Sequence, residues 1–203
     1  MEYKIFYGER LINAQFNEII MSKPVKDQVD NAIKMISAVE LTLDNQMKKL
    51  KEKDSIIFSQ VVANLKKGNR PRAKMLANEL SVIRRSIKMV STSHFALNTI
   101  KERLITVTDY GEFVSAISPA LAITKSIQKD VSMTAPEASN GLSRIASDLN
   151  DIITNSGTPD IGYSPQAGEE AEKIIQEAAK LAEQRTMKTL PEVPNTLGEA
   201  EAI

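Results

Sequence analysis

The stretch that decides the fold is KKGNRPRAK, residues 66–74, which separates two long segments of helical pattern. Gly68 and Asn69 are typical of a helix end, because both residue types tolerate the left-handed backbone that closes a helix. Pro71 favours the first turn of a new helix, since its missing N–H has no helical partner there in any case. The stretch therefore predicts a tight turn between two helices.

An apolar repeat with alternating steps of four and three residues flanks this turn on both sides. Eight of the ten repeat positions from Val29 to Val61 are apolar, as are seven of the ten from Leu76 to Thr108. Such a repeat places one apolar seam along a helix that packs on a partner helix. The sequence therefore predicts an all-α fold whose main feature is a long antiparallel helical hairpin.

Polar residues interrupt both seams. Glu40 and Asp54 lie at seam positions of the first segment, where an occasional charge more often sets the register than performs catalysis. His94, the single histidine, lies in the second seam. Because the chain has no cysteine to join it in a metal site, we expect a packing or hydrogen-bonding role for His94.

Shorter helices are expected after the hairpin. The segment 112–133 has a less regular apolar face, and Pro119 predicts a kink or a restart with Ser118 as the N-cap. Thr134 and Glu137 then form the pattern of a capping box. The helix that this box opens is expected to end at Gly157.

The pattern divides the chain into five regions. They are an amphipathic segment at 1–22, a helical core at 23–157, a linker at 158–168, an acidic helix at 169–188 and a tail at 189–203. The linker is recognised by its glycines and prolines. The acidic helix has an Ala-rich apolar face and is too short to be stable alone, so we expect it to dock elsewhere on the protein.

Composition excludes several classes of function. The 26 basic and 26 acidic residues cancel, but residues 1–110 carry +7 and residues 111–203 carry −7. No apolar run approaches the length of a membrane span, and the start of the chain lacks the layout of a signal peptide. Phosphate-binding loops, dinucleotide fingerprints and metalloprotease motifs are absent from the sequence. We therefore expect an intracellular protein that is not an enzyme and uses no metal or cofactor.

The stretch LPEVP, residues 190–194, ends the helical pattern near the C-terminus. Both prolines lack an amide proton and push the preceding residue toward extended geometry. The segment is therefore preset as a short extended peptide. It is either a frayed tail or a docking peptide, which would lose little conformational entropy on binding.

This order of elements resembles the layout of ESCRT-III (Snf7-type) subunits. The stretches RAKMLANELSVIRRSIKMVSTSHFALNTIKERLITVTDYGEF (72–113) and LSRIASDLNDI (142–152) are similar to the archaeal CdvB branch of that family. The resemblance covers most of the chain and rests on organisation more than on a strict motif. Because the sequence stops at Ile203, it resembles the short CdvB paralogues that lack a C-terminal winged helix.

The resemblance implies a subunit that polymerises with itself and with other CdvB paralogues, remodels membrane in archaeal cell division, and changes between closed and open states. It also implies disassembly by a Vps4-type AAA ATPase (CdvC). The tail matches the Leu-Pro-x-Val-Pro kernel of type 2 MIT-interacting motifs, which bind the MIT domain of that ATPase. The implied contact residues are Leu190, Pro191, Val193, Pro194 and Leu197.

The resemblance implies that the protein is located in the cytoplasm, on the inner face of the cell membrane at the division site. The basic hairpin is expected to adsorb to anionic lipid, the alternative being a solvated helix face. The aromatic residues near the N-terminus belong either to a short helix docked on the body or to an interfacial helix that enters the headgroup layer. The expected membrane residues are Phe6, Tyr7, Phe16, Lys23, Lys26, Lys34, Lys48, Lys49, Lys51, Lys53, Lys66, Lys67, Arg70 and Arg72.

Two other classes of function compete with this interpretation. A BAR-like or coiled-coil membrane adaptor would dimerise without forming filaments. Nucleic-acid binding is less well supported, because the Lys-rich region carries no recognition motif and no interleaved aromatic residues. We therefore expect no nucleic-acid partner.

Overall fold

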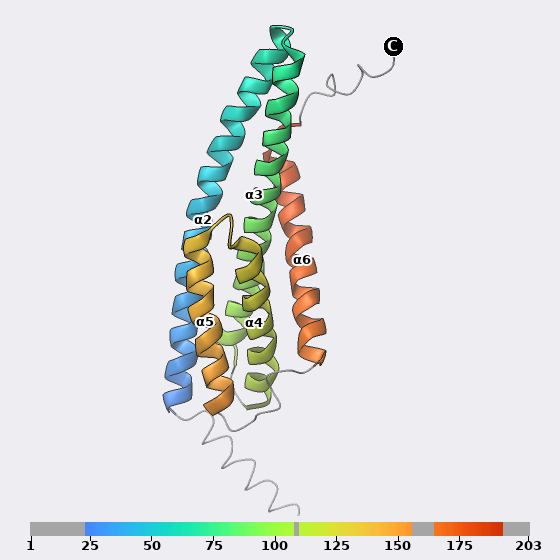
Figure 1. Ribbon diagram of the computed structural model, residues 1–203. Coiled ribbons are helices and arrows are strands. Elements are labelled where there is room, and N and C mark those ends of the chain that lie inside the picture. The colour runs from blue at the N-terminus through green and yellow to red at the C-terminus, as the bar shows by residue number, and fades with distance from the viewer. Residues whose placement is uncertain (1–22, 108–109, 156–164, 193–203) are drawn as a thin grey trace, which may run out of the picture.

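The computed structural model describes residues 23–107, 110–155 and 165–192, and within these ranges every regular element is an α-helix. Helix α2 (Lys23–Lys66) and helix α3 (Arg70–Ile105) run antiparallel and form the longest pair in the molecule (Figure 1). The predicted all-α fold with a long helical hairpin is confirmed. The N-terminal segment 1–22 lies outside the described residues.

The turn between α2 and α3 has the predicted chemistry. Gly68 adopts a φ of 71°, in the left-handed region that glycine enters without strain. The side chain of Asn69 caps α3 by accepting a hydrogen bond from the N–H of Arg72, and Pro71 lies in the first turn. Local chemistry at three positions within four residues therefore reverses the chain.

Helix α4 (Tyr110–Val131) and helix α5 (Pro136–Asn155) form a second, shorter hairpin. The predicted restart at Pro119 with Ser118 as the N-cap is wrong, because α4 continues through this residue. The alternative, a kink at Pro119, stays a prediction. Burial explains the difference: Ile117 and Ala120, on either side of the proline, are almost completely inaccessible to solvent. The packing of these two residues in the core outweighs the cost of about 3 kcal/mol that a proline imposes on the interior of an isolated helix.

The capping box predicted at Thr134 is also wrong. Helix α5 begins at Pro136, which leaves Thr134 in the preceding turn. The carbonyl of Thr134 accepts a hydrogen bond of 2.8 Å from the side-chain amide of Gln46, on α2. Proline at the first helical position and this long-range bond place the helix start one residue later than a capping box at Thr134 predicts. The predicted end of the helix at Gly157 lies outside the described residues.

Helix α6 (Pro165–Thr189) packs along α3 and α4 (Figure 1). It begins before the predicted residue 169, because Pro165 opens the helix at a position where its missing N–H has no cost. The end of the predicted linker, residues 165–168, is therefore the first turn of α6. The remainder of that linker, residues 158–164, lies outside the described residues.

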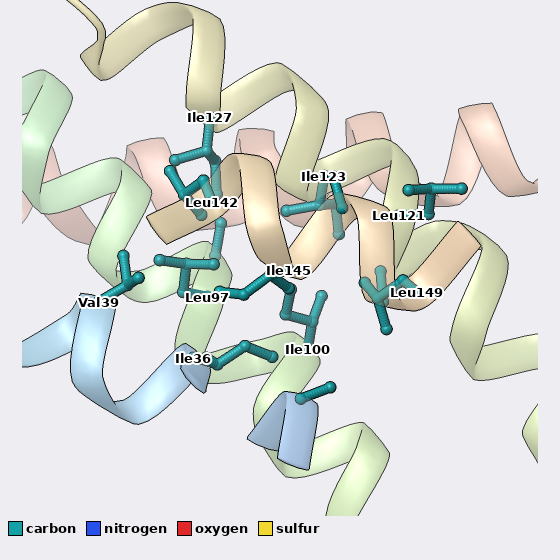
Figure 2. Close-up of a cluster of buried hydrophobic side chains, with 14 of the residues drawn as sticks. Ile36, Val39, Leu97, Ile100, Leu121, Ile123, Ile127, Leu142, Ile145 and Leu149 are labelled. Atoms are coloured by element: carbon teal, nitrogen blue, oxygen red, sulfur yellow. The ribbon is translucent and has the colours of Figure 1, made fainter. Parts of the chain in front are cut away.

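The hydrophobic core occupies only one half of the long hairpin. Figure 2 shows how aliphatic side chains of α2, α3, α4 and α5 meet in it, among them Ile36, Leu97, Ile123 and Ile145. On the hairpin, the buried residues of this core run from Val29 to Leu50 on α2 and from Ile87 to Leu104 on α3.

Beyond the core, residues 51–86 continue as two helices that pack mainly on each other, and we call them the distal stalk. Figure 1 shows that the turn end of the stalk projects past α4, α5 and α6. The buried apolar residues in the stalk are Val61, Ala73, Leu76 and Leu80. The outer faces of the stalk are therefore exposed to solvent.

Close packing of α5 on α2 depends on Gly141. A Cβ atom at this position would lie 2.6 Å from Cγ2 of Val39, which is below any normal contact distance. Only glycine allows the α5 backbone to lie this close to the Val39 side chain. The contact is a sensitive point for the docking of α4 and α5 on the hairpin.

We predict that Gly141→Ala lowers the free energy of unfolding by about 1–3 kcal/mol, the usual cost of overpacking. Adding Val39→Ala should restore part of the loss, since it removes the clashing methyl group. Urea denaturation followed by circular dichroism measures both changes. Gly168→Ala is the matched control, because Gly168 is an exposed helical glycine with no atom within 4 Å of the added Cβ. Equal effects at the two glycines would contradict the packing argument.

Candidate functional site

Polar pairs cross the hairpin seam at three levels. Glu40 binds Lys101, with 2.5 Å between the carboxylate oxygen and Nζ. Asp44 lies 3.4 Å from Nε2 of His94, and Asp54 binds Nε of Arg84 at 2.8 Å. The two seam charges that the sequence singled out, Glu40 and Asp54, each have a partner on the opposite helix.

These pairs favour one alignment of the two helices. The side chain of Asp54 is 2% exposed and that of Glu40 is 10% exposed, so an alignment that separated either from its partner would bury an unpaired charge. Breaking a buried pair in this way typically costs about 3–5 kcal/mol. A shift of the hairpin by one helical turn would therefore be strongly unfavourable, in agreement with the expected role in register.

His94 has the packing and hydrogen-bonding surroundings that we expected. Its ring is half-buried beside Asp44 and meets the ring of Phe95 edge to face, with 5.9 Å between centroids. Among the described residues, no group of three or more His, Asp or Glu side chains is arranged to hold a metal ion.

Helix α6 docks on the hairpin through small side chains. Its buried residues are Ala171, Ile174, Ala178 and Ala182, with Ile175 partly buried. Most of these residues are alanines, so the docked face buries less apolar area than larger side chains would. Each Å² of buried apolar area stabilises the docked state by about 25 cal/mol. Apolar burial alone therefore holds α6 only modestly.

Polar contacts supplement this docking near both ends of α6. Near its start, Glu170 pairs with Arg103 of α3. Glu183 lies 3.2 Å from Lys88, and the guanidinium of Arg185 lies 4.5 Å from the ring centroid of Phe95. Exposed ion pairs stabilise by only about 0–1 kcal/mol each, so this interface is suited to reversible docking.

The beginning of the LPEVP segment lies against the hairpin. Leu190 is half-buried and packs against the core, and the carbonyl of Pro191 accepts a hydrogen bond of 2.7 Å from Nη2 of Arg84. Helix α6 ends at Thr189, as the prolines predict. Val193, Pro194 and Leu197 lie outside the described residues.

A shallow pocket of about 130 Å³ lies where the end of α6 meets the hairpin. Helices α2, α3 and α6 all contribute to its walls. Its apolar lining residues are Met47, Ile87 and Phe95. The polar lining residues are Asp44, Lys51, Ser91, His94, Arg185, Thr186 and Thr189.

The basic residues expected to bind membrane fall into two groups. Lys26 and Lys34 are exposed near the start of α2, far along the hairpin from the turn. The others are exposed on the distal stalk or directly beside it: Lys48, Lys49, Lys51, Lys53, Lys66, Lys67, Arg70 and Arg72. Phe6, Tyr7 and Phe16, together with the side chain of Lys23, lie outside the described residues.

The distal stalk is both basic and partly apolar on its surface. Residues 51–86 contain nine basic and three acidic residues, a net charge of +6. Ile56, Met75 and Val82 are more than half exposed on it. None of the helices in the described part of the chain is long and apolar enough to cross a membrane.

Two curated proteins of Sulfolobus acidocaldarius are similar to this chain over most of its length. Cell division protein B1 is 29% identical over 173 residues, which are 84% of this chain and 81% of the relative. Cell division protein B is 31% identical over 155 residues, which are 75% of this chain and 59% of that relative. Together these two similarities support assigning the chain to the CdvB group of the ESCRT-III family. It matches no protein-family model and no solved structure.

One site residue of this CdvB-type chain, Arg84, was missed by sequence reasoning. It lies between the seam residues Ile83 and Ile87 and is not itself a seam residue, so the apolar repeat does not identify it. Counting outward from the turn at Gly68 places Asp54 and Arg84 at nearly equal distances along the two helices. That count identifies the Asp54 pair, but it gives no sign of the contact with Pro191.

Proposed function

We propose that this CdvB-type protein is a subunit of a membrane-remodelling polymer that acts in cell division. The observation that carries the proposal is the distal stalk, a long two-helix projection with a charge of +6 and open apolar side chains. A stalk of this kind offers surfaces for lipid and for neighbouring subunits. The names of the two relatives, both cell division proteins, support the biological setting.

The lipid partner that fits the stalk is an anionic membrane surface on the inner face of the cell. Each Lys or Arg close to such a surface contributes about 1 kcal/mol, so a handful of stalk residues gives reversible adsorption. The N-terminal segment 1–22, with its aromatic residues, is proposed to add an apolar contribution by entering the headgroup layer.

The polymer partner that fits the stalk is a second copy of this chain or another CdvB paralogue. Exposed Ile56, Met75 and Val82 offer apolar area that a monomer leaves in water. Stacking of stalks would bury this area, and the long hairpin gives a continuous strip along which copies can align. The role is structural, and we propose no catalytic step for it.

Helix α6 is proposed to restrain assembly by occupying part of α3. The supporting observation is that α6 docks through alanines and exposed ion pairs, an interface weak enough to open. The segment beyond it, LPEVP, is proposed to bind the MIT domain of a Vps4-type ATPase. Leu190 and Val193 would fill apolar pockets, and Pro191, Pro194 and Leu197 would complete the contact.

We predict that charge reversal on the stalk weakens membrane binding. The variant Lys66→Glu/Lys67→Glu should pellet less with vesicles of 30% phosphatidylglycerol than the control Lys26→Glu/Lys34→Glu, which changes the net charge equally. Raising NaCl from about 0.1 M to about 1 M should release the wild type, because the screening length falls from about 10 Å to about 3 Å.

Binding that ignores both salt and lipid charge would contradict the basic-surface proposal. Sedimentation of the pure protein without lipid tests polymer formation in the same assay, because filaments pellet and dimers stay in solution. A protein that remains a dimer at all concentrations would instead favour the BAR-like or coiled-coil adaptor.

We predict that a peptide of residues 187–203 binds the MIT domain of the ATPase. Leu190→Asp/Val193→Asp should abolish the heat of binding in calorimetry, since a charge cannot enter an apolar pocket without a large desolvation cost. Glu192→Ala is the matched control, because the kernel leaves that position open. If the doubly substituted peptide binds as well as the wild type, the motif assignment is wrong.

We predict that truncation after Gly157, which removes α6, lowers the protein concentration at which filaments form. Truncation after Glu192 is the control, since it keeps α6 and removes only the residues beyond it. Electron microscopy and sedimentation, without any ATPase, measure the threshold. Equal thresholds for both truncations would show that α6 does not restrain assembly.

A further inference from the structure

Arg84 connects the hairpin seam to the end of α6. Its Nε and Nη2 donate to the two carboxylate oxygens of Asp54, at 2.8 Å and 3.4 Å. The same Nη2 donates to the carbonyl of Pro191 at 2.7 Å. The guanidinium also lies 5.9 Å from the ring centroid of Phe58. One side chain therefore joins α2, α3 and the segment that follows α6.

The pair with Asp54 positions the Arg84 side chain independently of the contact with Pro191. Asp54 is almost fully buried in the seam and the Arg84 side chain is 21% exposed, so the carboxylate holds the planar guanidinium in place. The remaining donor capacity of Nη2 is directed at Pro191. Little side-chain entropy is lost when the Pro191 carbonyl binds, because the arginine is already ordered.

Leu190 adds an apolar contact next to this hydrogen bond. Its N–H completes the last turn of α6 by donating to the carbonyl of Thr186 at 3.0 Å, and its side chain packs against the core. Both Leu190 and Pro191, the first two residues of the LPEVP segment, therefore contact the rest of the protein when α6 is docked.

We infer that the hairpin is itself a receptor for Leu190 and Pro191, and that it competes with the MIT domain for them. The inference rests on the proposed MIT partner. The side chain of Leu190 cannot pack against the core and fill a pocket of another domain at once. Arg84, positioned by Asp54, is the latch of this competition.

Docking of α6 and binding of the MIT domain weaken each other. If docking of α6 weakens MIT binding, then MIT binding weakens the docking of α6 by the same factor. The MIT domain alone, without ATP hydrolysis, therefore releases α6 from a free subunit. Binding of the MIT domain opens closed subunits, in addition to any action of the ATPase on assembled ones.

The strength of the latch is measurable as a ratio of dissociation constants. The apparent constant of the full chain equals that of the free peptide divided by the unlatched fraction. A hydrogen bond to a charged group at a partly exposed site suggests that losing the latch raises this fraction about three- to tenfold. The Arg84→Ala chain should bind the MIT domain more tightly than wild type by that factor.

The experiment compares Arg84→Ala with Arg85→Ala in the full chain. Arg85 is the exposed neighbour of the same type and makes neither the Asp54 nor the Pro191 contact. Calorimetry gives the affinity for the isolated MIT domain, and the free 187–203 peptide sets the upper limit. Hydrogen exchange of the α6 amides gives the unlatched fraction without any partner.

A second variant guards against unfolding, because Arg84→Ala leaves the buried Asp54 unpaired. Asp54→Leu/Arg84→Leu removes both charges together, a change that is often neutral in stability, and continues the apolar seam. Exchange across residues 50–90 checks that the hairpin remains folded. The double variant should show the same faster α6 exchange and tighter MIT binding as Arg84→Ala.

The Arg84 latch and the MIT partner can be refuted separately. Wild-type exchange and wild-type affinity in both Arg84 variants would overturn the latch. Faster exchange of α6 in these variants, with a free peptide that does not bind the MIT domain, would support the latch and overturn the partner assignment. Added MIT domain should also speed exchange in α6 of the wild type, and unchanged exchange at saturation would overturn the competition.

Discussion

The seam between α2 and α3 is the interaction on which the rest of the structure depends. Its apolar residues hold the two helices together, and the pairs Glu40–Lys101 and Asp54–Arg84 favour one register. All other described helices pack on this pair or on one another. A shift of the seam would move the α3 surface that receives α6 and the α2 surface that receives α5.

Helices α5 and α6 differ in how closely they pack on the hairpin. At Gly141, α5 approaches α2 so closely that a single methyl group would clash, which makes that contact specific in position. Helix α6 instead presents alanines and exposed ion pairs, so its docking is less demanding and weaker. A well-packed core with a weakly held last helix suits the exchange of partners that we propose for this subunit.

Arg84 links the hairpin seam to the segment that follows α6. The arginine belongs to the seam through Asp54 and to the tail through Pro191. Because the seam orders the guanidinium, the tail contact forms at low entropic cost. The same order means that the tail can leave without disturbing the hairpin, so docking and release of α6 need not unfold the core.

Sequence by itself determined the features that depend on neighbouring residues. The turn at Gly68, the two seams and the end of α6 before the prolines all follow from local backbone chemistry and apolar periodicity, and the structure agrees with them. Only the tertiary structure decided that α4 continues through Pro119 and that Thr134 lies before α5. It also decided that Arg84 reaches Pro191, a residue 107 positions away. These outcomes depend on burial and on contacts between distant segments, and a periodic pattern carries no information on which distant surface a helix will meet.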